Sequence, residues 1–345
     1  MLLLLLIMLM INPYYLYNMS FQYSYIISFT LIAFNYKLKN KSNFVKCLML
    51  SFFSFLVSLP ITVYNFCQVN ILSIIYNLVI VPFISFIIFP LSLISFIVPM
   101  ISYVLNIFVN ILEFVSLLLS NSKIGILSFS MPNMLIIILY YFLIYLFMYN
   151  YKYFYIFILL FLHKFFPYFD IDTRVVYFDV SQGDSNFISY PCNSMNILID
   201  TGGNEFSKSS FVLSRTIPYL KSIGKSKINY LVITHGDYDH MGEAINLVNN
   251  FKVENVIFNC GEYNDLEKEL IKVLDKKKIK YYSCIKELNT DKYKLQFLNT
   301  KEYNNENDNS NVIYFNYNDY KFLFMGDAGV EKEKDILEKY NLENI

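Results

Sequence analysis

The residues with the clearest capacity for chemistry lie in one short segment, Thr234–Gly242, which reads T-H-G-D-Y-D-H-M-G. Four of its side chains can bind a metal ion, and they include two of the three histidines in the chain. The segment follows the apolar run Tyr230–Ile233 and precedes a helix that we expect to begin near Gly242. A strand end fixes such a loop, so alternate side chains can converge on one or two cations. The four candidate ligands are His235, Asp237, Asp239 and His240.

Two further strand ends carry carboxylates that fit the same site. The apolar run Ile197–Ile199 ends at Asp200, and the run Phe322–Met325 ends at Gly326 and Asp327. Either feature alone is ordinary, because strands often end in turns rich in Asp and Gly. Together with the histidine segment, they would bring carboxylates from three strand ends to one sheet edge. The alternative for the histidine segment is a polar loop whose aspartates cap the following helix.

The strands and helices that would position these residues lie after about residue 170. Six strand-like runs are interspersed with helical stretches, an order that indicates a layered α/β domain. Asn318-Asp319, between the last two runs, predicts a hairpin turn. The six runs are Val175–Val180, Asn196–Asp200, Tyr230–Thr234, Asn255–Asn259, Asn311–Tyr317 and Tyr320–Met325.

Residues 1–168 have the composition of a membrane domain. The chain is 55% hydrophobic and has 28 basic and 28 acidic side chains, of which only eight lie in this half. No charge lies between Lys46 and Glu113, a stretch long enough for several spans of about 20 residues each. The candidate spans are 21–36, 47–66, 71–90, 91–119, 133–149 and 151–168.

A cluster of lysines gives the orientation of this half. The cluster follows the first candidate span and predicts a cytoplasmic loop. Five candidate spans follow it, and an odd number would place the C-terminal domain outside the membrane. We therefore expect a multi-pass protein of the cell membrane with an extracytoplasmic C-terminal domain. The cluster consists of Lys37, Lys39, Lys41 and Lys46.

Net charge and cysteine content give no sign of a further partner or site. The formal net charge is zero, so the overall charge does not indicate a nucleic-acid partner. The five cysteines form no CxxC pair and no zinc-ribbon spacing. We interpret them as scattered small apolar residues.

The order of the motifs resembles that of a known superfamily. D-T-G-G, then T-H-x-D-x-D-H-x-G, then a strand ending in G-D is similar to the metallo-β-lactamase superfamily. The usual motif there is HxHxDH, and Asp237 stands where the second histidine would be. That departure is typical of the ComEC branch, as is the segment Phe178–Ser185, in which Ser181 replaces the usual glycine. In the first half, Asn12-Pro13-Tyr14-Tyr15 and the run Asn77–Pro82 resemble the competence membrane domain.

The resemblance to the ComEC family implies a fold and a domain division. It implies a competence-type, multi-pass α-helical membrane domain over residues 1–168. A partial α/β metallo-β-lactamase-type αββα sandwich would follow over residues 169–345. Family members also have an OB-like domain before the helices and a His-His-Gly-Ser type motif after the position of Asp327. We therefore expect the first domain to be incomplete at its N-terminus and the second to be truncated at its C-terminus.

The resemblance also assigns roles to individual residues. It makes His235, Asp237, Asp239 and His240 metal ligands and makes Asp327 the carboxylate that bridges two cations. Asp239 and His240 are also the two residues on which catalysis would depend. Three further carboxylates would hold and orient the ligands, as metal sites generally require: Asp200, Asp179 and Asp184.

The implied cofactor is a divalent metal. Two cations about 3.5–4 Å apart can activate a water molecule and stabilise the leaving oxygen of a phosphodiester. Asp237 in place of an imidazole makes the site richer in oxygen, which favours Mn²⁺, with Mg²⁺ and Zn²⁺ as the other candidates.

The implied function is DNA uptake in natural competence. The membrane domain would form a channel for single-stranded DNA, and the metal domain would be a phosphodiesterase or nuclease. The expected partners are single-stranded DNA, the lipid bilayer and other proteins of the competence machinery. Two alternatives stay open: another hydrolase of the same fold, acting on a thioester or lactone, and a catalytically inactive membrane fragment. Because the expected truncation removes a histidine motif, the sequence favours an incomplete active site and leaves open whether this chain is an enzyme.

Overall fold

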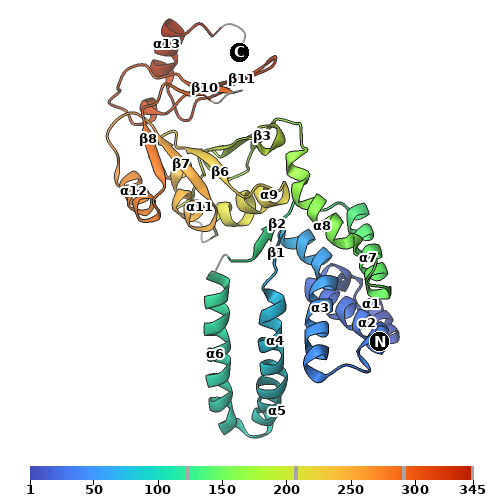
Figure 1. Cartoon of the computed structure of the whole chain (residues 1–345). Coiled ribbons are helices and arrows are strands. Elements are labelled where there is room, and N and C mark those ends of the chain that lie inside the picture. Colours follow the sequence, from blue (N-terminus) through green and yellow to red (C-terminus); the bar gives the residue numbers. More distant parts are fainter. Residues whose placement is uncertain (122–123, 206–208, 290–292, 343–345) are drawn as a thin grey trace. The chain divides into compact units, whose positions relative to one another are not determined.

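The computed structural model describes residues 1–121, 124–205, 209–289 and 293–342, and Figure 1 shows their helices and strands. The chain divides into two compact units, Met1–Lys164 and Phe165–Ile345. The boundary expected from the sequence, after residue 168, lies four residues beyond this division. Each unit has a hydrophobic core of its own.

The first unit consists almost entirely of apolar helices. In the described chain, three stretches are long and apolar enough to cross a membrane: Asn43–Phe66, Ser73–Ile97 and Pro99–Leu119. A short strand pair, β1 (Gln68–Asn70) and β2 (Ile126–Ser128), joins the segments that follow the first and third stretches. The helices are α1 (Leu2–Ile11), α2 (Met19–Ala33), α3 (Asn43–Phe66), α4 (Ser73–Phe83), α5 (Phe89–Ile97), α6 (Ser102–Asn121), α7 (Met134–Tyr149) and α8 (Tyr155–Phe165).

The long apolar block of residues 71–119 divides at a different place from the predicted one. The expected break lay between residues 90 and 91. Instead the helical path continues through Pro82 and Pro90, with a wider π-helical turn at Ile84–Ile88 between them. It ends at Val98, whose backbone is extended with φ −119° and ψ 92°. A residue that precedes a proline disfavours the helical conformation, so Pro99 sets the boundary here.

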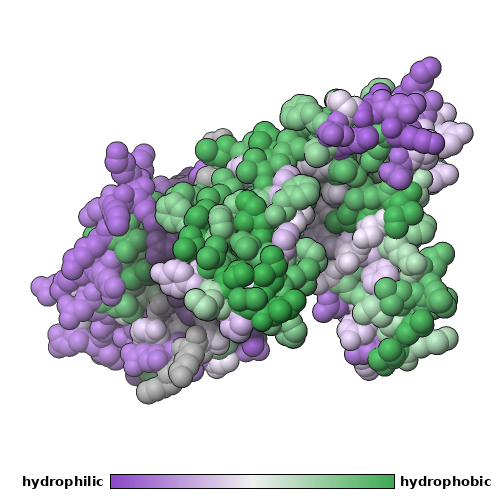
Figure 2. Space-filling view, turned by 90° about the horizontal axis from the view of Figure 1, so that it is seen from below, coloured by the Kyte–Doolittle hydropathy of each residue, from purple (hydrophilic) through white to green (hydrophobic). Residues whose placement is uncertain are grey.

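The surface of the first unit is apolar over wide areas. One face of α3 is buried against α7 and α8 in a core that includes Leu56, Tyr140 and Ile156. By contrast, α4 and α5 contain no buried residue. Figure 2 shows hydrophobic residues gathered in broad continuous areas on the face it presents. Exposed apolar areas of this size mark contact with a membrane or partner, and with three helices of spanning length they identify a membrane protein.

The second unit contains two β-sheets. The larger, mixed sheet has the strand order β3-β4-β5-β6-β7-β8, and the smaller, antiparallel sheet has the order β12-β11-β10-β9. The parallel pairs from β5 to β8 require crossover connections, and these carry α9 (Ile217–Ser222), α11 (Ala244–Asn250) and α12 (Asp265–Lys277). The strands are β3 (Arg174–Tyr177), β4 (Asn186–Ser189), β5 (Asn196–Ile199), β6 (Ile228–Val232), β7 (Val253–Phe258), β8 (Lys280–Ser283), β9 (Glu287–Asn289), β10 (Lys294–Phe297), β11 (Ile313–Tyr317) and β12 (Tyr320–Phe324).

Alternation along the strands produces a four-layer sandwich. In β5, Leu198 points into a core shared with α9, α11 and α12, whereas Ile197 and Ile199 point into the core between the two sheets. On the far side of the smaller sheet, α13 (Val330–Lys339) places Ile336 against Val312. The layers are therefore helix, sheet, sheet and helix, so the predicted αββα sandwich is confirmed. Each of the six predicted strands is present, within two residues of its expected start.

One sequence-based interpretation was wrong for two cysteines. Cys260 and Cys284 form a disulfide, with Cα atoms 4.5 Å apart. The parallel pairing of β7 with β8 places Phe258 beside Ser283, and the two cysteines follow directly at the strand ends. Their separation of 24 residues gives no hint of this contact, because the pairing of the strands alone creates it.

Candidate metal centre

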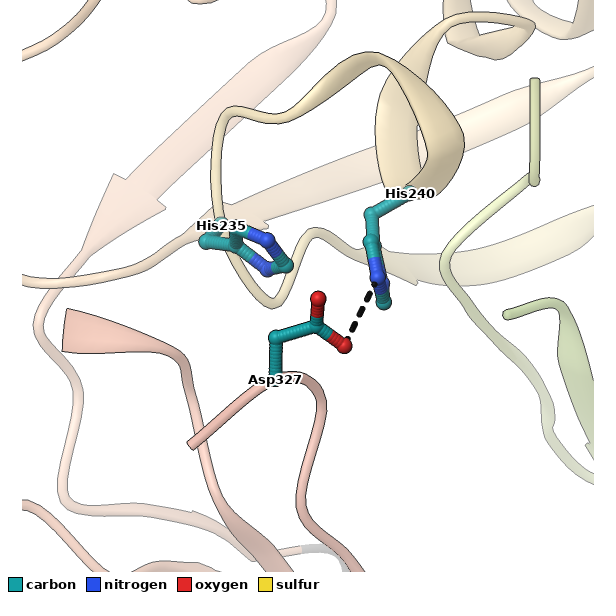
Figure 3. A group of neighbouring side chains, drawn as sticks. All are labelled: His235, His240 and Asp327. Carbon is teal, nitrogen blue, oxygen red and sulfur yellow. Dashed lines mark ion pairs between the residues drawn. The ribbon is translucent and has the colours of Figure 1, made fainter. Parts of the chain in front are cut away.

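Three side chains of the second unit converge on one point, as Figure 3 shows. His235 lies in the loop after β6, His240 lies on the short helix α10 (Tyr238–Met241), and Asp327 lies in the loop after β12. One ligand atom from each side chain lies within 4.8 Å of the others. The group therefore combines a strand end from each sheet with a helix that begins inside the histidine segment.

Helix α10 begins earlier than the sequence predicts. A helix was expected from about Gly242, but Asp237 already occupies the N-cap position, with extended backbone angles of φ −74° and ψ 150°. Its carbonyl accepts hydrogen bonds from the backbone N–H groups of His240 and Met241, at 3.1 and 3.0 Å. The turn carries Asp239 and His240 on a helical backbone and so fixes the direction in which His240 points.

Asp200 is fully buried and forms hydrogen bonds with two residues of the histidine segment, Thr234 and His240. Its Oδ1 accepts a hydrogen bond from the Thr234 backbone N–H at 2.8 Å, and its Oδ2 accepts one from the Thr234 hydroxyl at 2.6 Å. Oδ2 also lies 2.9 Å from Nδ1 of His240. A carboxylate on one imidazole nitrogen fixes the ring and leaves the other nitrogen for a metal. Here that other nitrogen, Nε2 of His240, lies 3.2 Å from Asp327.

These carboxylates determine the charge of His240. Burial alone would lower the pKa of this buried imidazole. The hydrogen bond and charge of Asp200, with the charges of Asp327 and Asp239, outweigh burial and raise the pKa of His240 to about 9. The surrounding carboxylates therefore favour the positively charged form of His240, which offsets part of the negative charge gathered at this point.

Asp327 reaches the histidines because the hairpin that carries it packs directly on Thr234. Gly326, just before it, has a left-handed backbone with φ +54°. A Cβ at Gly326 would lie 3.0 Å from Cβ of Thr234 and 3.2 Å from Cβ of Ser310, so a larger residue would push the hairpin away. The close approach of glycine brings a carboxylate of the smaller sheet to the histidines of the larger one.

His235 has the features of a metal ligand. It is fully buried, and its Nδ1 lies 3.1 Å from the Thr234 hydroxyl. Its Nε2 has no hydrogen-bond partner within the described part of the chain, and the Asp237 carboxylate lies 3.5 Å away. A buried polar atom without a hydrogen bond costs roughly 1–3 kcal/mol. Imidazole and carboxylate donors suit a divalent transition metal, so the residues present fit such an ion.

The two middle aspartates of the segment stand further out than the sequence suggests. Asp237 and Asp239 are not part of the group of three whose ligand atoms lie within 4.8 Å of one another. The Asp237 side chain is 43% exposed, and Asp239 is partly exposed on the first turn of α10. Asp237 lies 3.5 Å from Nε2 of His235, and the roles of both aspartates as ligands stay predictions.

The two aspartates of the segment Phe178–Ser185 differ from each other. Burial raises the pKa of Asp184, and the charges of Asp200, Asp327 and Asp239 raise it further, against a lowering effect of His240. Asp184 therefore shares the electrostatic environment of the centre. Asp179 does not: its side chain is 82% exposed and pairs with Arg215 at 2.9 Å. Its role in orienting the ligands stays a prediction.

Three residues with clear structural roles were not singled out from the sequence. Thr234 stands inside the recognised segment, but no pattern indicated that its hydroxyl would bridge Asp200 and His235. Asn311 donates from its backbone N–H to the Thr234 carbonyl at 2.7 Å, and Asn264 donates to the Gly236 carbonyl at 2.8 Å. The spacing N-x-x-E from Asn264 to Glu267 would have indicated a helix start, although not this contact.

Comparison with known proteins agrees with both units. The family model described as "Competence protein" matches residues 1–153, and the model described as "Metallo-beta-lactamase superfamily" matches residues 193–342. One relative, ComE operon protein 3 of Bacillus subtilis (strain 168), is 26% identical over 297 residues, or 77% of this chain and 38% of the relative. The chain thus spans well under half the length of this relative.

Solved structures of metallo-β-lactamase fold are also similar, at low scores. The metallo-beta-lactamase fold protein YhfI from Bacillus subtilis is 11% identical, with a TM-score of 0.28 over 46% of this chain and 60% of that chain. A metallo-beta-lactamase from Staphylococcus aureus subsp. aureus COL is 16% identical, with a TM-score of 0.30 over 49% and 50%. The family model, rather than these scores, identifies the fold, and this fold implies that the second unit binds a divalent metal.

Proposed function

This chain belongs to the ComEC family of competence proteins, and from that premise we propose that it acts in DNA uptake. We assign a competence-type transmembrane domain to residues 1–168 and a metallo-β-lactamase-like domain to residues 169–345. The first would help form a path for single-stranded DNA through the lipid bilayer, together with other proteins of the competence machinery. The second would cleave phosphodiester bonds.

The observation that carries the second assignment is the convergence of His235, His240 and Asp327, where a buried imidazole nitrogen has no hydrogen-bond partner among the described residues. We assign the metal to these residues and to Asp237 and Asp239 beside them. When bound, divalent cations there would lower the pKa of a water molecule and neutralise charge on a phosphodiester oxygen. The protein's own part is to hold His240 through Asp200 and to keep the carboxylates on the open side, where a large substrate can reach them.

The donor set favours Mn²⁺ over Zn²⁺. Asp237 adds oxygen where the superfamily usually has an imidazole, and Asp239 and Asp327 add two more carboxylates. Carboxylate-rich sites suit Mn²⁺ and Mg²⁺, whereas sites rich in imidazole suit Zn²⁺. Metal analysis of the purified chain should therefore return manganese, and stoichiometric zinc would overturn this assignment.

Helix ends in the first unit support an extracytoplasmic second domain. The Nζ of Lys37, in the lysine cluster, donates a hydrogen bond to the carbonyl of Tyr149 at 2.7 Å, so α7 ends on the side of that cluster. The pairing of β1 with β2 brings the ends of α3 and α6 together on the other side. In the proposed topology the lysines mark the cytoplasmic side, and the short apolar segment Tyr155–Tyr168, which includes α8, would carry the chain back towards the second domain.

The disulfide supports the same orientation. Disulfides persist in oxidising compartments and are rare where cellular thiols stay reduced. A bond between Cys260 and Cys284 therefore suits a domain outside the cytoplasm. A tag at the C-terminus should be removed by protease added to intact protoplasts. Protection of that tag, with a cytoplasmic control protein also protected, would show the opposite orientation.

The nuclease activity can be tested on the full chain purified in detergent. With Mn²⁺, the wild-type chain should cleave fluorescent single-stranded DNA, and Asp239→Ala and His240→Ala should each reduce the rate by about 100-fold or more, as loss of an essential catalytic group does. Glu287→Ala, which changes an exposed carboxylate paired with Lys294 on strand β9, is the matched control and should keep the rate. Unchanged cleavage in both active-site variants would reject the residue assignment. Turnover of a thioester without any cleavage of DNA would favour another hydrolase of this fold.

A further inference from the structure

The backbone that carries the candidate ligands is held from outside by Asn264, the residue at which helix α12 begins. We infer that Asn264 is a positioning residue for the metal centre. It fixes the peptide between His235 and Asp237, whose side chains lie beside each other with His235 Nε2 3.5 Å from Asp237 Oδ2. The inference rests on the proposed metal site and adds a residue to it that lies outside the histidine segment.

Asn264 uses every hydrogen-bonding group of its side chain. Its Nδ2 donates to the Gly236 carbonyl at 2.8 Å and to Oε1 of Glu306 at 2.8 Å. Its Oδ1 accepts from the Glu267 backbone N–H at 2.9 Å, and Oε2 of Glu267 accepts from the Asn264 backbone N–H at 2.8 Å. The last two bonds form a capping box at the start of α12. One amide thus joins a helix start, the ligand loop and the loop of Glu306.

Only a side-chain amide can cap helix α12 and also donate hydrogen bonds to both Gly236 and Glu306. The cap needs an acceptor, and the two clamping bonds need two N–H groups on the same side chain. Aspartate offers acceptors alone, and serine caps a helix well but is too short to reach across. Asn264 therefore does more than a helix cap requires.

The contact between Asn264 and the Gly236 carbonyl requires glycine at position 236. A Cβ at Gly236 would lie 2.0 Å from Nδ2 of Asn264 and 2.6 Å from Oε1 of Glu306, so no side chain fits while the clamp is closed. The glycine gives the amide access to the backbone directly between two candidate ligands.

A second asparagine holds the same segment on the other side of His235. Asn311 donates from its side chain to the Ile233 carbonyl at 2.9 Å and from its backbone N–H to the Thr234 carbonyl at 2.7 Å. The backbone around His235 is therefore fixed at both ends by groups from distant parts of the chain. Asn264 is the member of this pair whose loss can be separated from loss of a buried core contact.

The test is Asn264→Ser, which keeps an oxygen for the helix cap and removes the amide. In the purified full chain, Mn²⁺ affinity measured by calorimetry should fall about tenfold, the size expected for loss of a group that orients metal ligands. The melting temperature of the metal-free chain should fall by only about 2–4 °C, because serine keeps the helix cap and only the two bonds to Gly236 and Glu306 are lost. Asn133→Ser is the matched control, because Asn133 caps α7 in the first unit, and it should change neither quantity.

The Mn²⁺ affinity of the wild-type chain and of Asn264→Ser decides whether Asn264 positions the metal ligands. Wild-type affinity in Asn264→Ser, or affinity that falls only in step with the melting temperature, would overturn the positioning role and leave the metal site standing. A wild-type chain that binds no Mn²⁺ would overturn both proposals. A second measurement uses Gly236→Ala: alone it should weaken Mn²⁺ binding about tenfold by displacing the amide, and in the Asn264→Ser background it should add little, because coupled neighbours are not additive. Full additivity would mean that the two residues act independently and that the clamp does not operate.

Discussion

The metal centre has two halves that the protein holds in different ways. The buried half is at most 1% exposed in every residue, and hydrogen bonds link its members into one network. The open half consists of carboxylates, and the side chains of Asp237 and Asp327 are 43% and 44% exposed. The buried half contains Asp200, Thr234, His235 and His240. The open half contains Asp237, Asp239 and Asp327.

The difference shows which side chains are oriented by the folded protein itself and which need a bound cation to orient them. In the buried half, Asp200 orients Thr234 and His240 before any metal arrives. In the open half, the side chains of Asp237 and Asp327 are partly exposed to water, so we expect a bound cation to fix them. Changes in the buried half should therefore cost stability first, and changes in the open half should cost metal affinity first.

Asp200→Ala should have the largest effect, and the effect should fall on folding. The substitution leaves the Thr234 N–H and a buried His240 cation without their partner, and removing one member of a buried pair costs about 3–5 kcal/mol. Thermal unfolding of the purified chain without metal would measure it. Asp179→Ala, in an exposed ion pair, is the control and should leave the transition in place. An equal loss of stability in the two variants would show that Asp200 does not stabilise the fold more than an exposed carboxylate does.

The second effect is a dependence of stability on pH, and it comes from Glu267, the buried residue that forms the capping box with Asn264. Burial raises the pKa of Glu267 to about 7; the charges of Glu306 and Asp237 add to this, and the Asn264 backbone N–H opposes it. The folded state therefore binds this proton more tightly than the unfolded state does. Stability is fully present below the unfolded pKa and is lost as pH rises from about 4.5 to about 7, by about 3 kcal/mol in total.

Glu267→Gln should remove that slope. The amide keeps an acceptor for the Asn264 N–H and does not titrate, so its unfolding free energy should change less between pH 4.5 and pH 7 than that of the wild-type chain. Denaturant unfolding at a series of pH values is the measurement. Identical pH profiles would mean that Glu267 stays ionised in the folded protein.

Asp327→Asn should show the reverse pattern, with affinity lost and the fold kept. The side chain is exposed and reaches the centre from the smaller sheet, so its exchange for an isosteric amide should shift stability by about 0.5 kcal/mol or less. Mn²⁺ affinity should fall on the order of 100-fold, since even partners that only orient ligands cost 10–100-fold. Calorimetric titration and thermal unfolding of the same sample would separate the two quantities. A variant that loses stability and keeps its affinity would reverse the roles of the two halves.

The sequence predicts the parts of this arrangement that are local. The ligands of the histidine segment stand within six residues, and Asp200 and Asp327 each follow an apolar strand, so type and spacing were enough to select them. The order of strands and helices likewise predicted a layered α/β domain, and the resemblance to the metallo-β-lactamase superfamily implied the sandwich. For Asp200, the structure adds the hydrogen bonds through which it holds Thr234 and His240.

The rest depends on contacts between distant segments. Asn264 and Asn311 reach the ligand loop only because strand pairing and sheet packing bring their loops there, and the Cys260–Cys284 disulfide depends on the pairing of β7 with β8. In the first unit, composition is so uniformly apolar that it could not locate the break at Val98. The periodicity of a sequence does not indicate which distant segments will come into contact.

The smallest effect is the one that tests the open half most directly. Asp237→His restores the imidazole that the superfamily usually has, at a position that is 43% exposed and 3.5 Å from His235, so the fold should tolerate it. An imidazole in place of a carboxylate favours Zn²⁺ over Mn²⁺, and we expect the ratio of the two affinities to shift towards zinc by about tenfold, or about 1.4 kcal/mol. Asn133→Ser, which exchanges a helix cap in the first unit, should leave the ratio as it is. Competition between the two metals on the full chain gives the answer. An unchanged ratio would mean that Asp237 does not touch the cation, and the open half would then reduce to Asp239 and Asp327.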